Sequence, residues 1–343
     1  YDDWAAAGNP GWSFRDVLPY FTRSENNEDF PASAYHGKGG PLNVKYLDSY
    51  NPLSEVLFEA AESMQYRRNA DFCGVTHEGF GRRQFTQKSG RRFSSAAAFL
   101  KPAQGRANLT VLTDALVHRV IVEQGRATGV ELSRGGKVEK VRATREVILS
   151  AGVIGSPQIL MLSGIGDAGH LTEHGIAVAH HLPGVGRNYR DHVASVVQYT
   201  SPTTVPYGLS WRTLPWAVWS VAQYALFRTG IFANAPGHSG GFIRTLPELT
   251  RPDVQFILIP AFRDAKGRTG IGHGFGLMTI VLRPESRGEV RLASADPAAA
   301  PVIDPKFFDQ PADLETLVRG LKIARRLINA PAFDRYRGEE TDP

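Results

Sequence analysis

Residues 146–166 read EVILSAGVIGSPQILMLSGIG, and this stretch decides the fold class. Its apolar start, residues 146–150, has the length and composition of a buried strand that ends at Ala151-Gly152. Ser156 is a good helix cap and Pro157 suits the first helical position, so a helix is predicted to begin there. A strand that leads directly into a helix indicates a mixed α/β chain.

The sequence on either side of this stretch is rich in short β-prone runs. Between residues 109 and 143 these runs are separated by glycines, which predicts a meander. Further runs occupy residues 193–200, 254–260, 277–282 and 289–292, and the last two predict a hairpin. A strongly amphipathic helix follows Pro311. The second half therefore predicts an antiparallel sheet with helices on one side.

Length and composition limit the protein classes that remain. A chain of 343 residues corresponds to two domains, or to one large interleaved domain. A hydrophobic content of 42% excludes wholesale disorder. The single cysteine, Cys73, excludes a disulfide scaffold and a cysteine-built metal site. The net charge of +5 comes from scattered arginines rather than from a clustered stripe, so nucleic acid is not an expected partner.

The most membrane-like segment runs from Trp211 to Phe227. Arg212, Pro215 and Gln223 interrupt it, so it falls short of the roughly 20 apolar residues that a spanning helix needs. No membrane-spanning segment is therefore expected. A buried helix is the favoured interpretation, ahead of a helix that lies on a membrane surface.

Two glycine motifs match known sites literally. Residues 164–169 match G-x-G-x-x-G, but a helix rather than a strand is predicted before them, which favours a structural turn. Residues 237–241 match G-x-S-x-G, the nucleophile elbow that would make Ser239 a hydrolase nucleophile. The residues after Ser239 look extended rather than helical, so the serine hydrolase stays a weak alternative.

Histidines suggest a metal site only superficially. His170 and His174 are four residues apart and would share a helix face. No carboxylate stands at the matching spacing, and no H-E-x-x-H occurs. Hydrogen-bonded or surface histidines are therefore expected, and no metal is predicted.

Residues 151–166 resemble the second signature of the glucose–methanol–choline (GMC) flavin oxidoreductases, with Val153 where that family usually has a small residue. Other segments resemble the same family, especially its choline-dehydrogenase-like branch, and follow one another in family order. These segments are 3–12, 35–41, 79–81, 92–96, 108–111, 182–192, 283–288, 304–305 and 336–340. The resemblance thus runs nearly from end to end, which makes it far more specific than either glycine motif.

The resemblance implies a particular fold and division of the chain. It implies an incomplete FAD-binding, Rossmann-like domain and an antiparallel-sheet substrate domain. Residues 1–106 would link the flavin and substrate sides, residues 107–192 would belong to the FAD-binding domain, and residues 193–343 would form the substrate domain.

The resemblance also implies an activity and a cofactor. Members of the family oxidise an alcohol to an aldehyde or ketone by hydride transfer to FAD, while a histidine accepts the hydroxyl proton. Val117 matches a position whose backbone touches the adenine, and Ala151 and Gly152 match positions near the cofactor. Ordinary strand packing is the alternative role for all three residues.

The substrate implied is a small alcohol, and His238 is the residue that bears on its identity. His238 matches the position where choline-oxidising members place a glutamate that attracts the quaternary ammonium. A histidine is a poor partner for a permanent cation. We therefore expect a substrate other than choline.

The family's dinucleotide glycines precede the residues that resemble Tyr1, and its catalytic histidine follows those that resemble Pro343. We therefore expect an internal fragment of a longer cytoplasmic protein, with membrane association left open. The isolated chain should bind FAD poorly and be inactive, so no catalytic residue is assigned within it. The alternative is a non-catalytic protein, or one that a partner chain completes. The electron acceptor, oxygen or a quinone, is left open.

Overall fold

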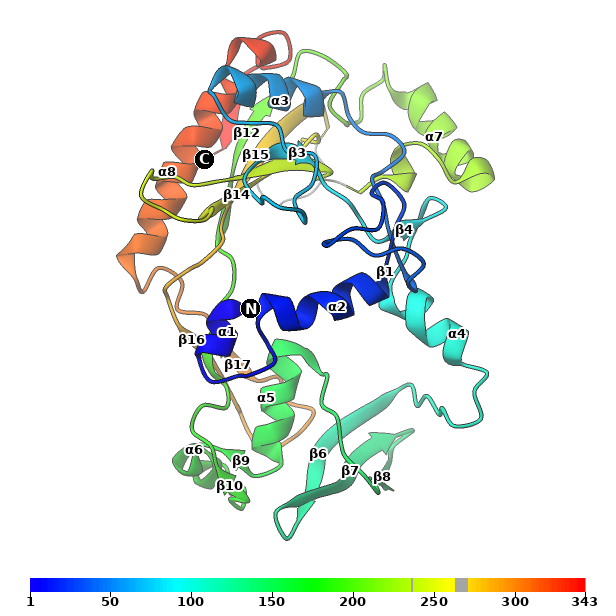
Figure 1. Ribbon diagram of the computed structural model, residues 1–343, viewed down its shortest axis with the longest axis vertical. Helices are drawn as coiled ribbons and strands as arrows, with labels where there is room; N and C mark the ends of the chain where they lie inside the picture. Colours follow the sequence, from blue (N-terminus) through cyan, green and yellow to red (C-terminus); the bar gives the residue numbers. More distant parts are fainter. Residues whose placement is uncertain (236, 263–270, 343) are drawn as a thin grey trace. The chain divides into compact units, whose positions relative to one another are not determined.

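The computed structural model describes residues 1–235, 237–262 and 271–342. It confirms the predicted mixture of helices and antiparallel strands (Figure 1). The chain forms two compact units. The first comprises residues 1–109, 194–283 and 315–343, and the second comprises residues 110–193 and 284–314. The division into three segments that the sequence suggests stays a prediction about the whole protein.

A six-stranded sheet organises the first unit, and every neighbouring pair of its strands is antiparallel (Figure 1). In spatial order the strands are β18 (Glu340–Asp342), β12 (Ala194–Thr200), β15 (Gly274–Val281), β14 (Val254–Ile259), β13 (Ser239–Ile243) and β3 (Gly79–Arg82). This sheet is the antiparallel sheet that the second half of the sequence predicts.

Helices α3 (Leu53–Ser63) and α8 (Pro311–Ile328) supply apolar side chains to the core of this sheet. Alternate residues of β14, including Phe256, point into the same core as Leu57 of α3 and Leu327 of α8. A strand presents alternate side chains to one face, whereas a helix presents every third or fourth. Apolar side chains at strand spacing in β14 and at helix spacing in α3 and α8 therefore pack into one apolar layer.

The rest of the first unit consists of shorter elements. Helix α2 (Phe14–Ser24) begins after Ser13, because Ser13 and Asp16 form a capping box. The remaining helices are α1 (Asp2–Ala6), α4 (Lys101–Ala103), α7 (Leu214–Phe227), and the short turns 96–100, 231–233 and 331–333. The remaining strands are the parallel pair β1 (Glu25–Asn27) and β2 (Leu42–Val44), and the pair β4 (Gln87–Lys88) and β5 (Arg91–Arg92).

Helix α7 forms where the sequence predicts it, but the expectation that it is buried is wrong. Ser220 is its one buried residue, and most of its large apolar side chains face solvent. Apolar composition alone does not determine whether a helix is buried, because burial depends on which neighbours cover it. Among the described residues, no helix has both the length and the hydropathy to cross a bilayer.

The second unit contains the predicted meander. Its strands are β6 (Ala115–Glu123), β7 (Arg126–Arg134) and β8 (Lys137–Arg142), joined in that order. Helices α5 (Gly152–Leu162) and α6 (Ala168–Glu173) follow, with a short parallel pair, β9 (Ile165–Gly166) and β10 (His180–His181). A second three-stranded sheet has the order β11 (Arg187–Tyr189), β16 (Gly288–Arg291) and β17 (Val302–Asp304).

Three local predictions around α5 are corrected. Residues 146–150 and 109–113 are not strands, because no described strand lies beside them, and Ile148 is 76% exposed. Helix α5 begins at Gly152 rather than at Pro157, which lies inside the helix. The Ser156 hydroxyl accepts a hydrogen bond from the Ala151 N–H at 3.1 Å, so it caps the chain from within the first turns. The structural turn at residue 164 is confirmed, since Gly164 has a φ of 81° directly after the helix.

The hairpin predicted over residues 277–292 is also wrong, because β15 and β16 belong to different sheets. The connection between them is held by the buried carboxylate of Asp313. That carboxylate accepts hydrogen bonds from the Glu285 N–H at 2.7 Å, the Ser286 N–H at 3.0 Å and the Ser286 hydroxyl at 2.5 Å. Burial alone would raise the pKa of Asp313, but these hydrogen bonds outweigh it and hold the pKa below its ordinary value.

Replacing Asp313 with asparagine should lower the free energy of unfolding by about 1–3 kcal/mol at neutral pH, because buried donors lose their acceptor. A carboxylate with a lowered pKa contributes stability above its unfolded pKa of about 3.9, and loses it as the pH falls through the folded value. The difference from wild type should therefore shrink below about pH 4. Urea unfolding across pH measures it. The exposed Asp309→Asn is the matched control, and equal stability of Asp313→Asn and wild type at neutral pH would refute the role.

Candidate functional site

The three predicted cofactor-side residues all lie in the second unit. Val117 is a half-buried residue of β6 that pairs with Leu132 of β7. In the described part of the chain, β6 is an edge strand, so one side of its backbone has no strand beside it. The register shifts just after Val117, between it and Arg119. An edge backbone of this kind can offer N–H and C=O groups to a flat, polar ring.

Ala151 and Gly152 form the exposed start of α5. Gly152 has a φ of 79°, a conformation that favours glycine, and a Cβ added there would meet no atom within 4 Å. The N-cap residue of α5 is Ala151, and it makes no side-chain hydrogen bond to the backbone N–H groups of the first turn. The space in front of this helix start is therefore open, and its backbone N–H groups suit negative or polar groups of a ligand.

The structure joins the strand and the helix that carry these residues. The Val120 N–H of β6 donates to the Ser163 hydroxyl at the end of α5, at 2.8 Å. An accessible strand backbone and an open helix start are the chemistry that a dinucleotide-type cofactor needs from a protein. These residues fit the flavin cofactor that the resemblance implies. The roles of Val117, Ala151 and Gly152 stay predictions.

His238 lies in the first unit, just before β13, and is buried. Its Nε2 accepts a hydrogen bond from the backbone N–H of Asn51 at 3.0 Å, which places the ring proton on Nδ1. Nδ1 then donates to the carbonyl of Ala235 at 3.2 Å. Both ring nitrogens are thus used within the protein, so His238 acts on its surroundings through the Asn51 backbone.

The electrostatics around His238 keep its ring neutral. Burial lowers the pKa of His238, and the nearby charge of Arg82 lowers it further, against the opposing hydrogen bond to Ala235. A neutral imidazole with a cation nearby gives no attraction to a quaternary ammonium. The predicted role of His238 as a substrate residue is untested, and its contacts favour positioning over direct contact.

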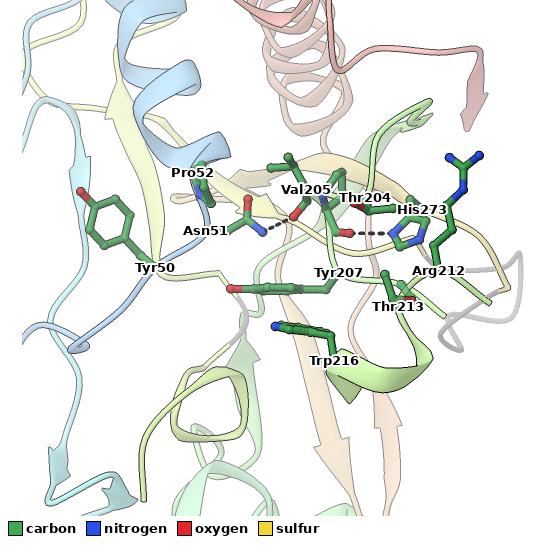
Figure 2. Close-up of a pocket in the computed structure, with 12 residues that line it drawn as sticks. Tyr50, Asn51, Pro52, Thr204, Val205, Tyr207, Arg212, Thr213, Trp216 and His273 are labelled. Carbon is green, nitrogen blue, oxygen red and sulfur yellow. Dashed lines mark hydrogen bonds between the residues drawn. The ribbon is translucent and has the colours of Figure 1, made fainter. Parts of the chain in front are cut away.

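A cavity of about 400 Å³ adjoins the segment that His238 supports (Figure 2). Its wall combines the turn before α3, the loop after β12, the start of α7 and the residue before β15. The lining residues are Tyr50, Asn51, Pro52, Thr204, Val205, Pro206, Tyr207, Gly208, Arg212, Thr213, Trp216 and His273. Its size is within the range of small-molecule pockets.

Hydrogen bonds fix the cavity wall. The Asn51 side-chain amide donates to the Val205 carbonyl at 2.7 Å, and His273 Nδ1 bonds the Pro206 carbonyl at 2.9 Å (Figure 2). His273 Nε2 also lies 3.0 Å from the Ser210 hydroxyl. These bonds tie the loop after β12 to two other segments, which preorganises the cavity.

The lining of this cavity is apolar with a few polar groups and no negative charge. None of its described lining residues is Asp or Glu, and Arg212 is its one permanent charge. Burial raises the pKa of Tyr207, so its hydroxyl stays protonated at neutral pH and can donate a hydrogen bond. The cavity can therefore hydrogen-bond a neutral molecule with a hydroxyl or carbonyl oxygen, and its described lining offers a cation no carboxylate.

The geometry around Ser239 and His170 bears on two motifs that the sequence raises. Ser239 is fully buried in a strand, and its hydroxyl lies 2.9 Å from that of Ser54, so it forms no nucleophile elbow and the serine hydrolase alternative is wrong. His170 lies against His174, with ring centroids 4.8 Å apart, and it is hydrogen-bonded within the protein, as the sequence predicts. Its Nε2 accepts a hydrogen bond from the Leu292 N–H at 3.1 Å.

Sequence reasoning missed the cavity itself. Its lining comes from four segments that are far apart in the chain, and most of its members are loop residues without a spacing rule. The one available signal was the aromatic and proline content of residues 204–216, which is unusual for an exposed loop.

The GMC oxidoreductase family models match residues 1–194 and 284–343. An alcohol dehydrogenase [acceptor] from Pseudomonas putida is 37% identical over 100% of this chain and 63% of its own length. An oxygen-dependent choline dehydrogenase from Rhizobium etli is 40% identical over 100% of this chain and 62% of its own length. The chain thus spans less than two thirds of these relatives.

Solved structures agree on the fold. Pyridoxine 4-oxidase from Mesorbium loti superposes with a TM-score of 0.86 at 25% identity, covering 99% of this chain and 64% of the other. An FAD-dependent oxidoreductase from Chaetomium thermophilum gives a TM-score of 0.87 at 24% identity, covering 100% of this chain and 68% of the other. The second likeness concerns the fold alone.

Proposed function

This chain belongs to the GMC oxidoreductase family, and from that premise we propose that it is part of a longer FAD-dependent enzyme that oxidises a neutral alcohol. The product is the corresponding aldehyde or ketone. The chain spans less than two thirds of the relatives' own length, so the activity is proposed for the longer protein. The enzyme is cytoplasmic.

One observation carries the proposal. Relatives with alcohol and choline dehydrogenase names are 37% and 40% identical across the whole of this chain rather than over one motif. Similarity of that extent covers both the cofactor-side unit and the unit that holds the cavity. Fold similarity alone would not support an activity, because one fold hosts many functions.

FAD supplies the hydride acceptor when it is bound, and this chain supplies binding and position. On the cofactor side, the backbone of Val117 and the open start of α5 at Gly152 are the groups that would hold it. On the substrate side, Tyr207 is a hydrogen-bond donor that can orient an alcohol oxygen in the cavity. His238 holds the Asn51 backbone, and Asn51 in turn holds Val205.

The proposal that the alcohol is neutral rests on charge. The position that matches a glutamate in choline-oxidising members is a neutral, fully hydrogen-bonded His238. The cavity next to it has an arginine and no carboxylate among its described lining residues. A trimethylammonium group placed there would lose its hydration without gaining a counter-charge.

The test compares choline with its neutral isostere 3,3-dimethylbutan-1-ol on the full-length protein. The two alcohols have the same shape, so a difference in kcat/KM reports on charge alone. We expect kcat/KM to be about tenfold or more higher for the neutral alcohol, within the usual range of pocket discrimination. A preference for choline would reject the substrate assignment, and no turnover of any alcohol by the flavin-loaded enzyme would reject the activity.

A further inference from the structure

Helix α7 is apolar around most of its circumference, yet most of its large apolar residues are exposed. The side turned toward the protein carries Thr213, Ala217, Ser220 and Tyr224, which recur at helical spacing and are buried or half-buried. The outward side carries large apolar residues, which we call the apolar face of α7: Leu214, Val218, Trp219, Val221 and Leu226. A soluble helix normally buries its apolar stripe and exposes its polar one.

The exposure of this face is extensive. Leu226 is 71% exposed, and Trp211, just before the helix, is 81% exposed. Phe227 and Phe232 continue the exposed apolar surface beyond the end of the helix. Single exposed apolar residues are ordinary, but a contiguous set of this size marks a surface that another body covers.

The charges around α7 indicate the chemistry of the partner that covers it. Residues 192–247 contain no Asp or Glu, whereas Arg212 and Arg228 flank the helix at its two ends. Two of the five tryptophans of the chain, Trp211 and Trp219, are exposed on this surface, whereas Trp216 lines the cavity. Tryptophan and arginine around an apolar helix face are typical of helices that lie in the interface of a membrane with anionic lipids.

We propose that α7 docks flat on the surface of a bilayer that contains anionic phospholipids. The apolar face of α7 enters the boundary between headgroups and acyl chains, and Arg212 and Arg228 pair with lipid phosphates. This is peripheral attachment, since no described helix can span a bilayer. The proposal concerns binding alone and does not depend on the proposed alcohol oxidation.

The test measures sedimentation of the full-length protein with vesicles of phosphatidylcholine, with and without phosphatidylglycerol. Binding should require phosphatidylglycerol and should weaken as salt is added, because salt screens the arginine contacts. The double variant Trp219→Ser/Leu226→Ser should bind at least about tenfold more weakly, since each side chain contributes burial of apolar area. Val75→Ser is the control, because Val75 is an apolar residue that is even more exposed and lies outside α7.

Charge is tested at one exposed position, where neither variant disturbs packing. Leu226→Lys should bind phosphatidylglycerol vesicles more tightly than Leu226→Glu, by about fivefold for each unit of charge. Equal flavin content and melting temperature of the two variants show that both are folded.

Several results would overturn the proposal. These are absence of wild-type binding to phosphatidylglycerol vesicles, equal binding by Trp219→Ser/Leu226→Ser, or equal binding by the lysine and glutamate variants. A wild-type dimer that the double variant converts to monomer, without vesicle binding, would assign the face to a second copy of the chain and would equally refute a lipid partner.

Discussion

Replacing Gly240 with alanine is expected to lower the free energy of unfolding by about 3 kcal/mol or more, or to prevent folding. Gly240 lies in β13, where it pairs with Ile257 of β14 on one side and Gly81 of β3 on the other. A Cβ at this position would lie 2.0 Å from the backbone carbonyl oxygen of Phe256. Backbone on both sides of a strand cannot shift without breaking the ladder, so the overlap is not relieved by a side-chain rotation.

The matched control for this substitution is Gly105→Ala. A Cβ at Gly105 would meet nothing within 4 Å, and its φ is not in the left-handed region. Its stability should stay within about 0.5 kcal/mol of wild type. Urea unfolding followed by circular dichroism compares the two variants. If Gly240→Ala were as stable as Gly105→Ala, the close approach of β13 to β14 would be wrong.

The second large effect is expected for His238→Ala, which should cost about 2–4 kcal/mol at neutral pH. The substitution removes a buried ring and leaves the buried Asn51 N–H without its acceptor. A purely structural role would also predict a loss of stability. A neutral ring predicts in addition that the loss of stability depends on pH.

The direction of that dependence follows from the lowered pKa. A histidine with a folded pKa below its unfolded value of about 6.5 contributes full stability above that unfolded value, because the unfolded state takes up the proton more readily. Its contribution is lost as the pH falls from there toward the folded pKa. The deficit of His238→Ala should therefore be largest at neutral pH and smaller in mild acid.

Urea unfolding across pH measures the free energy of unfolding of wild type and His238→Ala. The exposed His192→Ala is the control. His170, whose pKa is also lowered, chiefly by burial, remains in every variant and contributes the same slope to each. A deficit for His238→Ala that grows on acidification would contradict a neutral ring.

The sequence predicted the elements whose partners lie within the described chain. The meander from β6 to β8 and the amphipathic α8 both follow from local patterns that packing then satisfies. The predictions failed where a neighbour decides the outcome. Residues 146–150 have a strand's composition but no strand beside them, and α7 has a buried helix's composition but little covering it.

The candidate site divides in the same way. Val117, Ala151 and Gly152 were reached by resemblance, and their backbone settings became visible only in the structure. The interest in His238 came from the resemblance to the family, whereas its bond to the Asn51 backbone joins residues 187 apart in the chain and has no sequence signal. The cavity is lined by four segments that are far apart in the chain, so it could not be predicted locally.

Anaerobic reduction of the flavin in the full-length holoenzyme tests the central claim most directly. The same two alcohols are mixed with the enzyme without oxygen, and the loss of the oxidised flavin's visible absorbance is followed, which makes the result independent of the electron acceptor. The account predicts rapid bleaching by 3,3-dimethylbutan-1-ol and bleaching by choline that is slower by about tenfold or more. An oxidised flavin that no alcohol bleaches, or one that choline bleaches faster, would contradict it.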